Sequence, residues 1–196
     1  MLHEFYPVLP DAGWLKRLVP LGVKTVQLRL KDAAAEEVRR QIADCLQICA
    51  AEGCQLIVND YWQEAIDLGA DYIHLGQEDL AAADLAAIKR AGLKLGISSH
   101  SHDELATALA AEPDYVALGP IYETKLKKMK WAPQGLDRLG DWKSRIACPL
   151  VAIGGITVER ARAVLDAGAD SIAVVTDVVM HDDPEGRVRE WLRVVA

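Results

Sequence analysis

The sequence lacks the apolar segments that a membrane-spanning or secreted protein would need. Its apolar runs are short and interrupted by polar residues, whereas a helix that crosses a bilayer takes about 20 consecutive apolar residues. The first residues, Met1-Leu2-His3-Glu4, do not show the basic and then apolar pattern of a signal peptide. These absences predict a cytoplasmic protein with no membrane partner.

Positive charge is also scarce. The chain has 22 Lys and Arg against 29 Asp and Glu, a net charge of −7, whereas nonspecific binding to nucleic acid needs a basic face. We therefore expect no nucleic-acid partner. One loop is an exception, because it carries Lys125, Lys127, Lys128 and Lys130. Such a charge run is often a solvated surface, but this one follows an apolar segment and contains Thr124, which favours an anionic ligand.

Cysteine is sparse, and its spacing excludes the common cysteine-based sites. The four cysteines are Cys45, Cys49, Cys54 and Cys148. None forms a C-x-x-C pair, and no histidine lies nearby in the sequence to complete a zinc site. We interpret them as small buried thiols in a reducing compartment.

What the sequence does contain is a regular alternation of strand and helix signals. Apolar segments predict strands at residues 5–9, 25–30, 55–58, 72–75, 93–97, 115–118, 150–153 and 172–175. Helical patterns follow them at residues 14–21, 34–51, 62–68, 82–91, 102–111, 136–144, 158–167 and 186–194. Several of these helices end at a glycine, the usual left-handed cap before the next strand.

Eight such units in 196 residues, with no linker between them, predict the α/β class. We expect one domain over residues 1–196, a single compact (β/α)8 TIM barrel. A doubly wound open sheet is the alternative, but it would have fewer units. The first strand–helix turn also lacks the G-x-G-x-x-G pattern of dinucleotide-binding sheets.

Polar residues cluster where the predicted strands end, at the rim where parallel β/α folds bind substrates. In and after the second strand, Gln27, Arg29 and Lys31 alternate with apolar residues and are predicted to point inward on one side. They form either an internal hydrogen-bonded layer or a site for an anion or heterocycle. The second interpretation is favoured because buried cations need a partner.

Two carboxylates follow neighbouring strands. Asn59-Asp60 ends the third strand and Asp79 follows the fourth. Such a pair can share a hard cation such as Mg²⁺, which also takes phosphate oxygens from a substrate. Asp79 alone could instead cap a helix. Together with Lys31 and Lys127, the pattern favours Mg²⁺ bound with a polyphosphate.

The last two strands end in a different pattern. Gly154-Gly155 follows the seventh strand and Val175-Thr176 ends the eighth. Many barrels bind a phosphate at these positions through backbone N–H groups, and glycines let the anion approach the backbone closely. A plain turn is the alternative role for the two glycines.

Six motifs, taken in order along nearly the whole chain, carry a family resemblance. They are QLRLKD at 27–32, VNDYW at 58–62, HLGQEDL at 74–80, GISSH at 96–100, APQGL at 132–136 and VAIGGI at 151–156. Together they resemble the thiamine phosphate synthase family, and HLGQEDL is the most specific of them. The resemblance implies a (β/α)8 transferase that joins 4-amino-2-methyl-5-hydroxymethylpyrimidine diphosphate to a thiazole phosphate. The products would be thiamine phosphate and pyrophosphate.

The resemblance also implies roles for single residues. Those assigned to the pyrimidine diphosphate are Gln27, Arg29, Lys31, Asn59, Ser98 and Lys127. Those assigned to the thiazole phosphate are Thr124, Gly155, Val175 and Thr176. Asp60 and Asp79 would hold Mg²⁺, the expected cofactor, and Arg29, Ser98 and Lys127 would be the catalytic residues.

The chemistry of the residues agrees with this assignment. A pyrimidine with a ring amino group can expel pyrophosphate to leave a stabilised methylene cation, which the thiazole nitrogen then captures. Such a dissociative step needs cations on the leaving group, positioning and exclusion of water. It needs no nucleophile from the protein, and the sequence offers neither a Ser-His-Asp nor a Cys-His set.

Two positions depart from the family pattern. Leu126 replaces a hydroxyl residue in the basic loop, which removes a phosphate hydrogen bond worth roughly 1–2 kcal/mol. Asp177 places a negative charge beside the predicted phosphate site, where it either weakens that site or points away as a cap.

Two other functions stay open. One is a thiazole tautomerase, which would need no diphosphate–metal site. The other is a non-catalytic paralogue that binds thiamine intermediates, and Leu126 and Asp177 are its support. In each case the expected partners are small molecules, and the sequence is compatible with assembly into a homo-oligomer.

Overall fold

The structure, a computed structural model, describes residues 2–124 and 131–195. In these residues, eight parallel strands pair in sequence order, and β1 closes the barrel against β8. The strands are β1 (Phe5–Leu9), β2 (Thr25–Leu28), β3 (Gln55–Asn59), β4 (Tyr72–Leu75), β5 (Lys94–Ser99), β6 (Tyr115–Leu118), β7 (Leu150–Ile153) and β8 (Ser171–Val174). The predicted (β/α)8 TIM barrel is confirmed.

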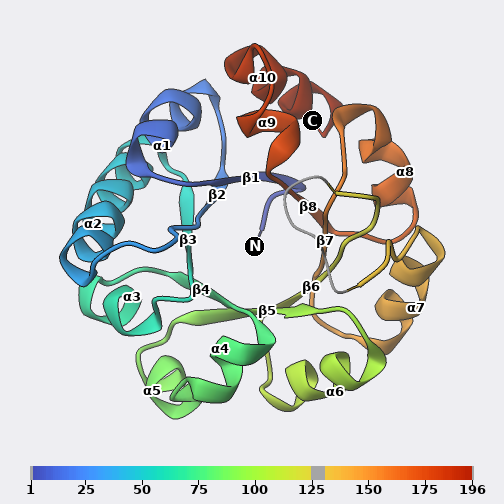
Figure 1. The fold of residues 1–196 in the computed structure, drawn as a ribbon, viewed down its shortest axis with the longest axis horizontal. Coiled ribbons are helices and arrows are strands. Elements are labelled where there is room, and N and C mark those ends of the chain that lie inside the picture. Colours follow the sequence, from blue (N-terminus) through green and yellow to red (C-terminus); the bar gives the residue numbers. More distant parts are fainter. Residues whose placement is uncertain (1, 125–130, 196) are drawn as a thin grey trace.

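Helices surround the barrel as an outer ring (Figure 1). The α-helices are α1 (Ala12–Leu18), α2 (Ala35–Glu52), α3 (Trp62–Leu68), α4 (Gln77–Ala82), α5 (Leu85–Arg90), α6 (His102–Ala110), α7 (Asp137–Arg145), α8 (Ala161–Asp166), α9 (Thr176–Val179) and α10 (Pro184–Val194). Two 3₁₀ helices, η1 (Val19–Leu21) and η2 (Val158–Arg160), extend α1 and precede α8.

Local chemistry explains where several helices start and end. Asp11 and Ser101 begin α1 and α6 by accepting hydrogen bonds from backbone N–H groups with their side chains. Helix α2 ends at Gly53, whose φ of 60° lies in the left-handed region that glycine adopts without strain. The caps fix the short connections that bring each strand back to the barrel.

The structure differs from the sequence prediction in a few elements. The helix predicted at 82–91 forms α5 and starts only at Leu85, because Ala83 is extended and the Asp84 side chain caps α5 by accepting from the Ala87 N–H. Helices α4 and α9 were not predicted, since six and four residues are too short for a helical period to show. Strand β2 ends at Leu28, two residues before the predicted end.

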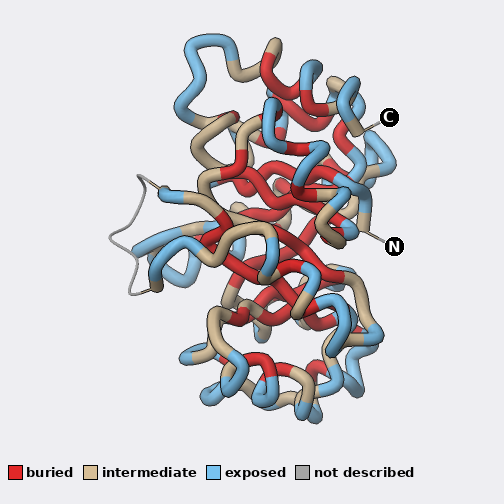
Figure 2. The backbone as a smooth tube through the Cα atoms, turned by 90° about the vertical axis from the view of Figure 1, so that its right-hand side faces the viewer, coloured by how far each residue is buried: buried red, intermediate tan, exposed pale blue. Residues whose placement is uncertain are grey.

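The core has two layers. One lies between the strands and the helices, and the other fills the inside of the barrel with side chains that include Tyr6, Ile57, Tyr72 and Tyr115. Figure 2 shows this buried backbone running through the middle of the molecule. A filled interior makes the barrel a rigid support for the loops at its C-terminal rim.

Candidate active site

A cavity of about 570 Å³ lies at the C-terminal ends of the strands. Its walls come from the ends of β1, β2, β5, β6, β7 and β8 and from the loops that follow them. Apolar groups such as Val8 and Ile153 line it together with polar residues. This size and mixture suit a small-molecule ligand. Five predicted site residues are in its lining, namely Arg29, Lys31, Ser98, Thr124 and Val175.

The three polar residues predicted for the second strand lie in two different settings. Gln27 is 4% exposed and lies within β2. Arg29 and Lys31 follow the end of β2, are exposed, and line the cavity from the loop. The expectation that all three point inward as buried groups is therefore wrong for Arg29 and Lys31, which are exposed because β2 stops at Leu28. Both cations instead lie where they can meet an anionic ligand.

The two predicted metal ligands come together at the rim. The Asp60 and Asp79 carboxyl groups lie close enough to interact directly, and the buried Asn59 side chain interacts with Asp60 as well. Burial and then the Asp79 charge raise the pKa of Asp60 to about 6, while Arg29 acts in the opposite direction. Two carboxylates this close repel each other unless a proton or a cation lies between them.

Backbone geometry holds this pair in place. Asp60 has a φ of 69°, a strained value for a residue other than glycine, and its N–H donates to the His74 carbonyl at 2.9 Å. Helix α4 starts after Gly76, so Asp79 lies in its first turn and Gly76 is the residue at the cap. The helix-capping role considered for Asp79 is therefore wrong.

Ser98 is tied to a buried histidine. Its Oγ lies 2.8 Å from His74 Nε2, and His74 Nδ1 lies 2.8 Å from the Tyr115 hydroxyl. The side chain of Gln27 hydrogen-bonds the same hydroxyl, and so does Tyr6. Burial, reinforced by Arg29, lowers the pKa of His74 to about 4, so the ring is neutral at pH 7. From the sequence we expected His74 to be a core residue or to support the site from behind, whereas Tyr6 and Tyr115 had no expected role, because pairing across strands leaves no local pattern.

The glycine pair after β7 has a packing role. Gly154 and Gly155 have φ values of 98° and 65°, which favour glycine. A Cβ on Gly155 would overlap the Glu123 carbonyl oxygen, and one on Gly154 would lie 2.7 Å from Pro120 Cα. The turn role considered for this pair is therefore present, and it brings the loop after β7 close to the loop after β6.

Asp177 turns away from the predicted phosphate site. Its Oδ1 accepts from Arg187 Nη2 at 2.8 Å, and its Oδ2 accepts from Arg187 Nε at 2.9 Å. Trp191 Nε1 and the Val158 N–H also donate to Oδ2, at 2.8 and 3.2 Å. Both charged side chains are only 9% exposed. Of the two outcomes left open by the sequence, the structure shows the one in which the charge is paired elsewhere. Val175 and Thr176, the first residue of α9, remain at the rim.

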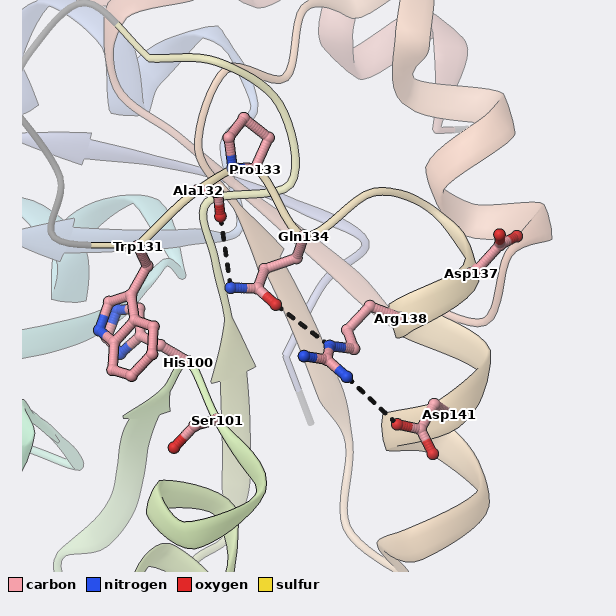
Figure 3. A pocket seen from close by; sticks show the side chains of 9 residues that line it. All are labelled: His100, Ser101, Trp131, Ala132, Pro133, Gln134, Asp137, Arg138 and Asp141. Atoms are coloured by element: carbon pink, nitrogen blue, oxygen red, sulfur yellow. Dashed lines mark hydrogen bonds and ion pairs between the residues drawn. The ribbon is translucent and has the colours of Figure 1, made fainter.

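A second hollow of about 580 Å³ adjoins the cavity, because His100 lines both. Figure 3 shows the Trp131 ring lying against His100, with centroids 6.0 Å apart. Gln134 Oε1 accepts from Arg138 Nε at 3.1 Å, and Arg138 lies 3.9 Å from Asp141. Two charged groups of this hollow, Arg138 and Asp141, are thus paired with each other.

Several predicted features fall outside the described residues. Lys127 and Leu126 lie in the segment 125–130, so the role assigned to Lys127 stays a prediction. In the part of the chain that the structure describes, no helix is long and apolar enough to cross a membrane. Within that same part, no group of three or more His, Cys, Asp or Glu side chains is placed to hold a metal ion. A metal here would rely on the two carboxylates and on ligands from outside the protein.

Comparison with known proteins identifies the family. The model for thiamine monophosphate synthase matches residues 9–178. A thiamine-phosphate synthase of Rhizobium etli is 62% identical over 196 residues, covering 100% of this chain and 96% of the relative. One of Neisseria meningitidis is 49% identical over 189 residues, covering 96% of this chain and 92% of the relative.

A solved structure agrees with the sequence matches. The thiamine phosphate pyrophosphorylase of Pyrococcus furiosus superposes with a TM-score of 0.87 at 27% identity. The match covers 98% of this chain and 95% of that one. The shared barrel, the six motifs at its rim and these matches lead to one conclusion: the chain belongs to the thiamine monophosphate synthase family.

Proposed function

We propose that this chain is a thiamine-phosphate synthase. As a transferase, it joins 4-amino-2-methyl-5-hydroxymethylpyrimidine diphosphate to a thiazole phosphate and releases pyrophosphate. The observation that carries the proposal is the paired carboxylates Asp60 and Asp79, which lie at the same rim as the cations Arg29 and Lys31. A diphosphate leaving group needs this combination of a cation site and fixed positive charge.

We assign the pyrimidine diphosphate to the side of the cavity near β2 and β5. Arg29 and Lys31 line this side and bring two positive charges to the diphosphate. Ser98 lines it from β5 and offers a hydroxyl to a phosphate oxygen. Gln27 and Asn59 are buried beside these groups, so each offers a fixed amide to the ligand or to its neighbours.

Asp60 and Asp79 fit a Mg²⁺ ion. Their carboxyl groups adjoin each other, and the raised pKa of Asp60 indicates that the pair is poorly compensated without a cation. Mg²⁺ prefers oxygen ligands and commonly keeps waters and substrate phosphate oxygens, so two protein carboxylates are enough. When bound, it would neutralise charge on the departing pyrophosphate.

The remaining residues position the reactants and exclude water. The apolar wall of the cavity, with Val8, Ile153 and Val175, surrounds the reacting carbon with groups that cannot act as nucleophiles. Arg29 and Lys31 stabilise the negative charge that grows on the pyrophosphate as the carbon–oxygen bond breaks. The thiazole phosphate is assigned to Thr124 and to the backbone of Gly155, Val175 and Thr176.

The two alternative functions are not favoured. A thiazole tautomerase transfers protons and has no use for a carboxylate pair beside two cations. A non-catalytic paralogue rested on Leu126 and Asp177, and Asp177 is paired with Arg187 away from the cavity. The partners are small molecules. The cytoplasm remains our proposed compartment, and assembly of copies into a homo-oligomer stays a prediction.

A reconstituted reaction tests the proposal. Purified protein is incubated with both substrates and Mg²⁺, and thiamine phosphate is measured by fluorescence after oxidation. Product should form with the wild type and with Asp166→Ala, which removes an exposed carboxylate paired with Arg162 on α8. EDTA and Asp60→Ala should each abolish it.

Two outcomes would contradict the assignment. If the wild type formed no product with Mg²⁺ present, the chain would not be a synthase. If Asp60→Ala kept full, Mg²⁺-dependent turnover, Asp60 would not be a metal ligand.

A further inference from the structure

A chain of polar side chains runs through the barrel from its core to the cavity. Tyr6 on β1, Tyr115 on β6, His74 on β4 and Ser98 on β5 are linked in that order by hydrogen bonds. The first three are 1%, 1% and 7% exposed, and Ser98 reaches the cavity wall. The buried core of the barrel thus reaches the cavity wall through one hydroxyl.

The direction of the two hydrogen bonds at His74 follows from the chemistry of its partners. A phenol is a stronger hydrogen-bond donor and a weaker acceptor than an aliphatic alcohol. The neutral ring of His74 therefore accepts from Tyr115, whose hydroxyl lies 2.8 Å from Nδ1, and donates to Ser98. An imidazole nitrogen is also a better acceptor than a phenol oxygen.

The tautomer of the histidine is then fixed. A neutral imidazole carries one N–H, and with Nδ1 accepting from Tyr115 that N–H is on Nε2. Nε2–H donates to Ser98 Oγ at 2.8 Å. The hydroxyl proton of Ser98 therefore points elsewhere, and the cavity is the open direction.

The backbone of Ser98 is fixed independently. Gln77, the first residue of α4, donates from Nε2 to the Ser98 carbonyl oxygen at 2.7 Å and to the Glu104 carbonyl oxygen at 3.3 Å. The serine is thus held at its backbone by one strand–helix unit and at its hydroxyl by His74. The Ser98 Oγ therefore has little freedom to move away from His74.

We propose that His74 is a positioning residue that holds the Ser98 hydroxyl as a hydrogen-bond donor toward the diphosphate of the substrate. Phosphate oxygens only accept hydrogen bonds, so a serine that donated to His74 would turn its lone pairs toward an anion. The chain of hydrogen bonds prevents this. The identity of the anion rests on the proposed function, whereas the tautomer does not.

Nitrogen-15 NMR of the wild type tests the tautomer without any substrate. We expect His74 to show a protonated Nε2 and an unprotonated Nδ1, and Tyr115→Phe to remove this preference because the donor to Nδ1 is gone. An Nδ1–H tautomer in the wild type would overturn the proposal. The tautomer can be measured even if the chain has no synthase activity. Failure of this proposal and failure of the proposed function are therefore distinguishable.

Binding and kinetics test the coupling to Ser98. His74→Leu should weaken binding of inorganic pyrophosphate with Mg²⁺, and kcat/KM for the pyrimidine diphosphate, by roughly 10- to 100-fold, as loss of one bond to a charged group does. His74→Gln, whose amide can still donate to Ser98, should keep most of the pyrophosphate binding and most of kcat/KM. His181→Leu, at an exposed histidine, serves as the matched control.

A double-mutant cycle separates positioning from general damage. In a Ser98→Ala background, His74→Leu should cause no further loss, since its effect passes through the missing hydroxyl. Ser144→Ala, which removes an exposed hydroxyl, is the control for Ser98→Ala. Multiplicative losses in the double variant would overturn the proposal. So would a His74→Gln variant that is folded and as impaired as His74→Leu.

Discussion

Asp60→Asn is expected to stabilise the metal-free protein while abolishing turnover. Burial and the Asp79 carboxylate raise the pKa of Asp60 from 3.8 to about 6, so ionising this group costs free energy in the folded state. A shift of about two pKa units corresponds to roughly 3 kcal/mol. Because Asp60 is partly exposed, solvent screens part of that cost, and we expect a gain of about 1–2 kcal/mol.

The pH dependence has a definite sign. The folded wild type binds a proton at Asp60 more tightly than the unfolded chain does, so its stability decreases as pH rises from 3.8 through 6. Asparagine does not titrate, so Asp60→Asn does not lose stability as pH rises through this range. The advantage of Asp60→Asn should therefore be full above about pH 6 and disappear toward pH 4.

Urea unfolding in EDTA, at several pH values between 4 and 8, measures the difference. Asp67→Asn, at a carboxylate whose side chain is 58% exposed, is the control and should leave the stability nearly unchanged. Adding Mg²⁺ should stabilise the wild type by mass action and leave Asp60→Asn unaffected. Parallel stability curves for the wild type and Asp60→Asn at every pH would refute the reasoning, as would equal stabilisation of both by Mg²⁺.

Two further changes test other parts of the structure. Arg187→Met leaves the buried Asp177 carboxylate without its bidentate partner, so we expect urea unfolding to show a loss of about 3–5 kcal/mol. A loss below 1 kcal/mol would contradict the burial of this pair. Gly96→Ala places a Cβ against the ring of Tyr115 inside the barrel, and overpacking of this kind costs roughly 1–3 kcal/mol. Unfolding midpoints measure this cost as well, and an unchanged midpoint would show that Tyr115 can move aside freely.

Much of this architecture could be predicted from the sequence, because local patterns carry it. The strands are short apolar segments bounded by turn residues, and the carboxylates follow consecutive strands, whose carboxyl ends meet at one rim. This pattern was sufficient to predict that Asp60 and Asp79 lie close together. The alternation of Gln27, Arg29 and Lys31 indicated a shared side, but it could not indicate that β2 stops before the last two.

The features that the sequence did not reveal depend on contacts between distant elements. His74 and Tyr115 are 41 residues apart, and their hydrogen bond depends on how β4 and β6 lie on either side of β5. The orientation of Asp177 depends on Arg187, which reaches it only when α10 packs against α9. Side chains that meet through tertiary packing leave no periodic trace in the residues around them.

The polar interior of the barrel has a consequence for how this enzyme can change over evolutionary time. Tyr115 serves Tyr6, Gln27 and His74 at once, so replacing any one of the four leaves buried polar groups on other strands without a partner. Gly96 is constrained by the same group of residues, because the Tyr115 ring fills the space that a larger side chain at position 96 would need. These five positions come from five different strands, and we expect substitutions at them to occur together or not at all. Redesign of the pyrimidine side of the cavity would have to alter them as a unit.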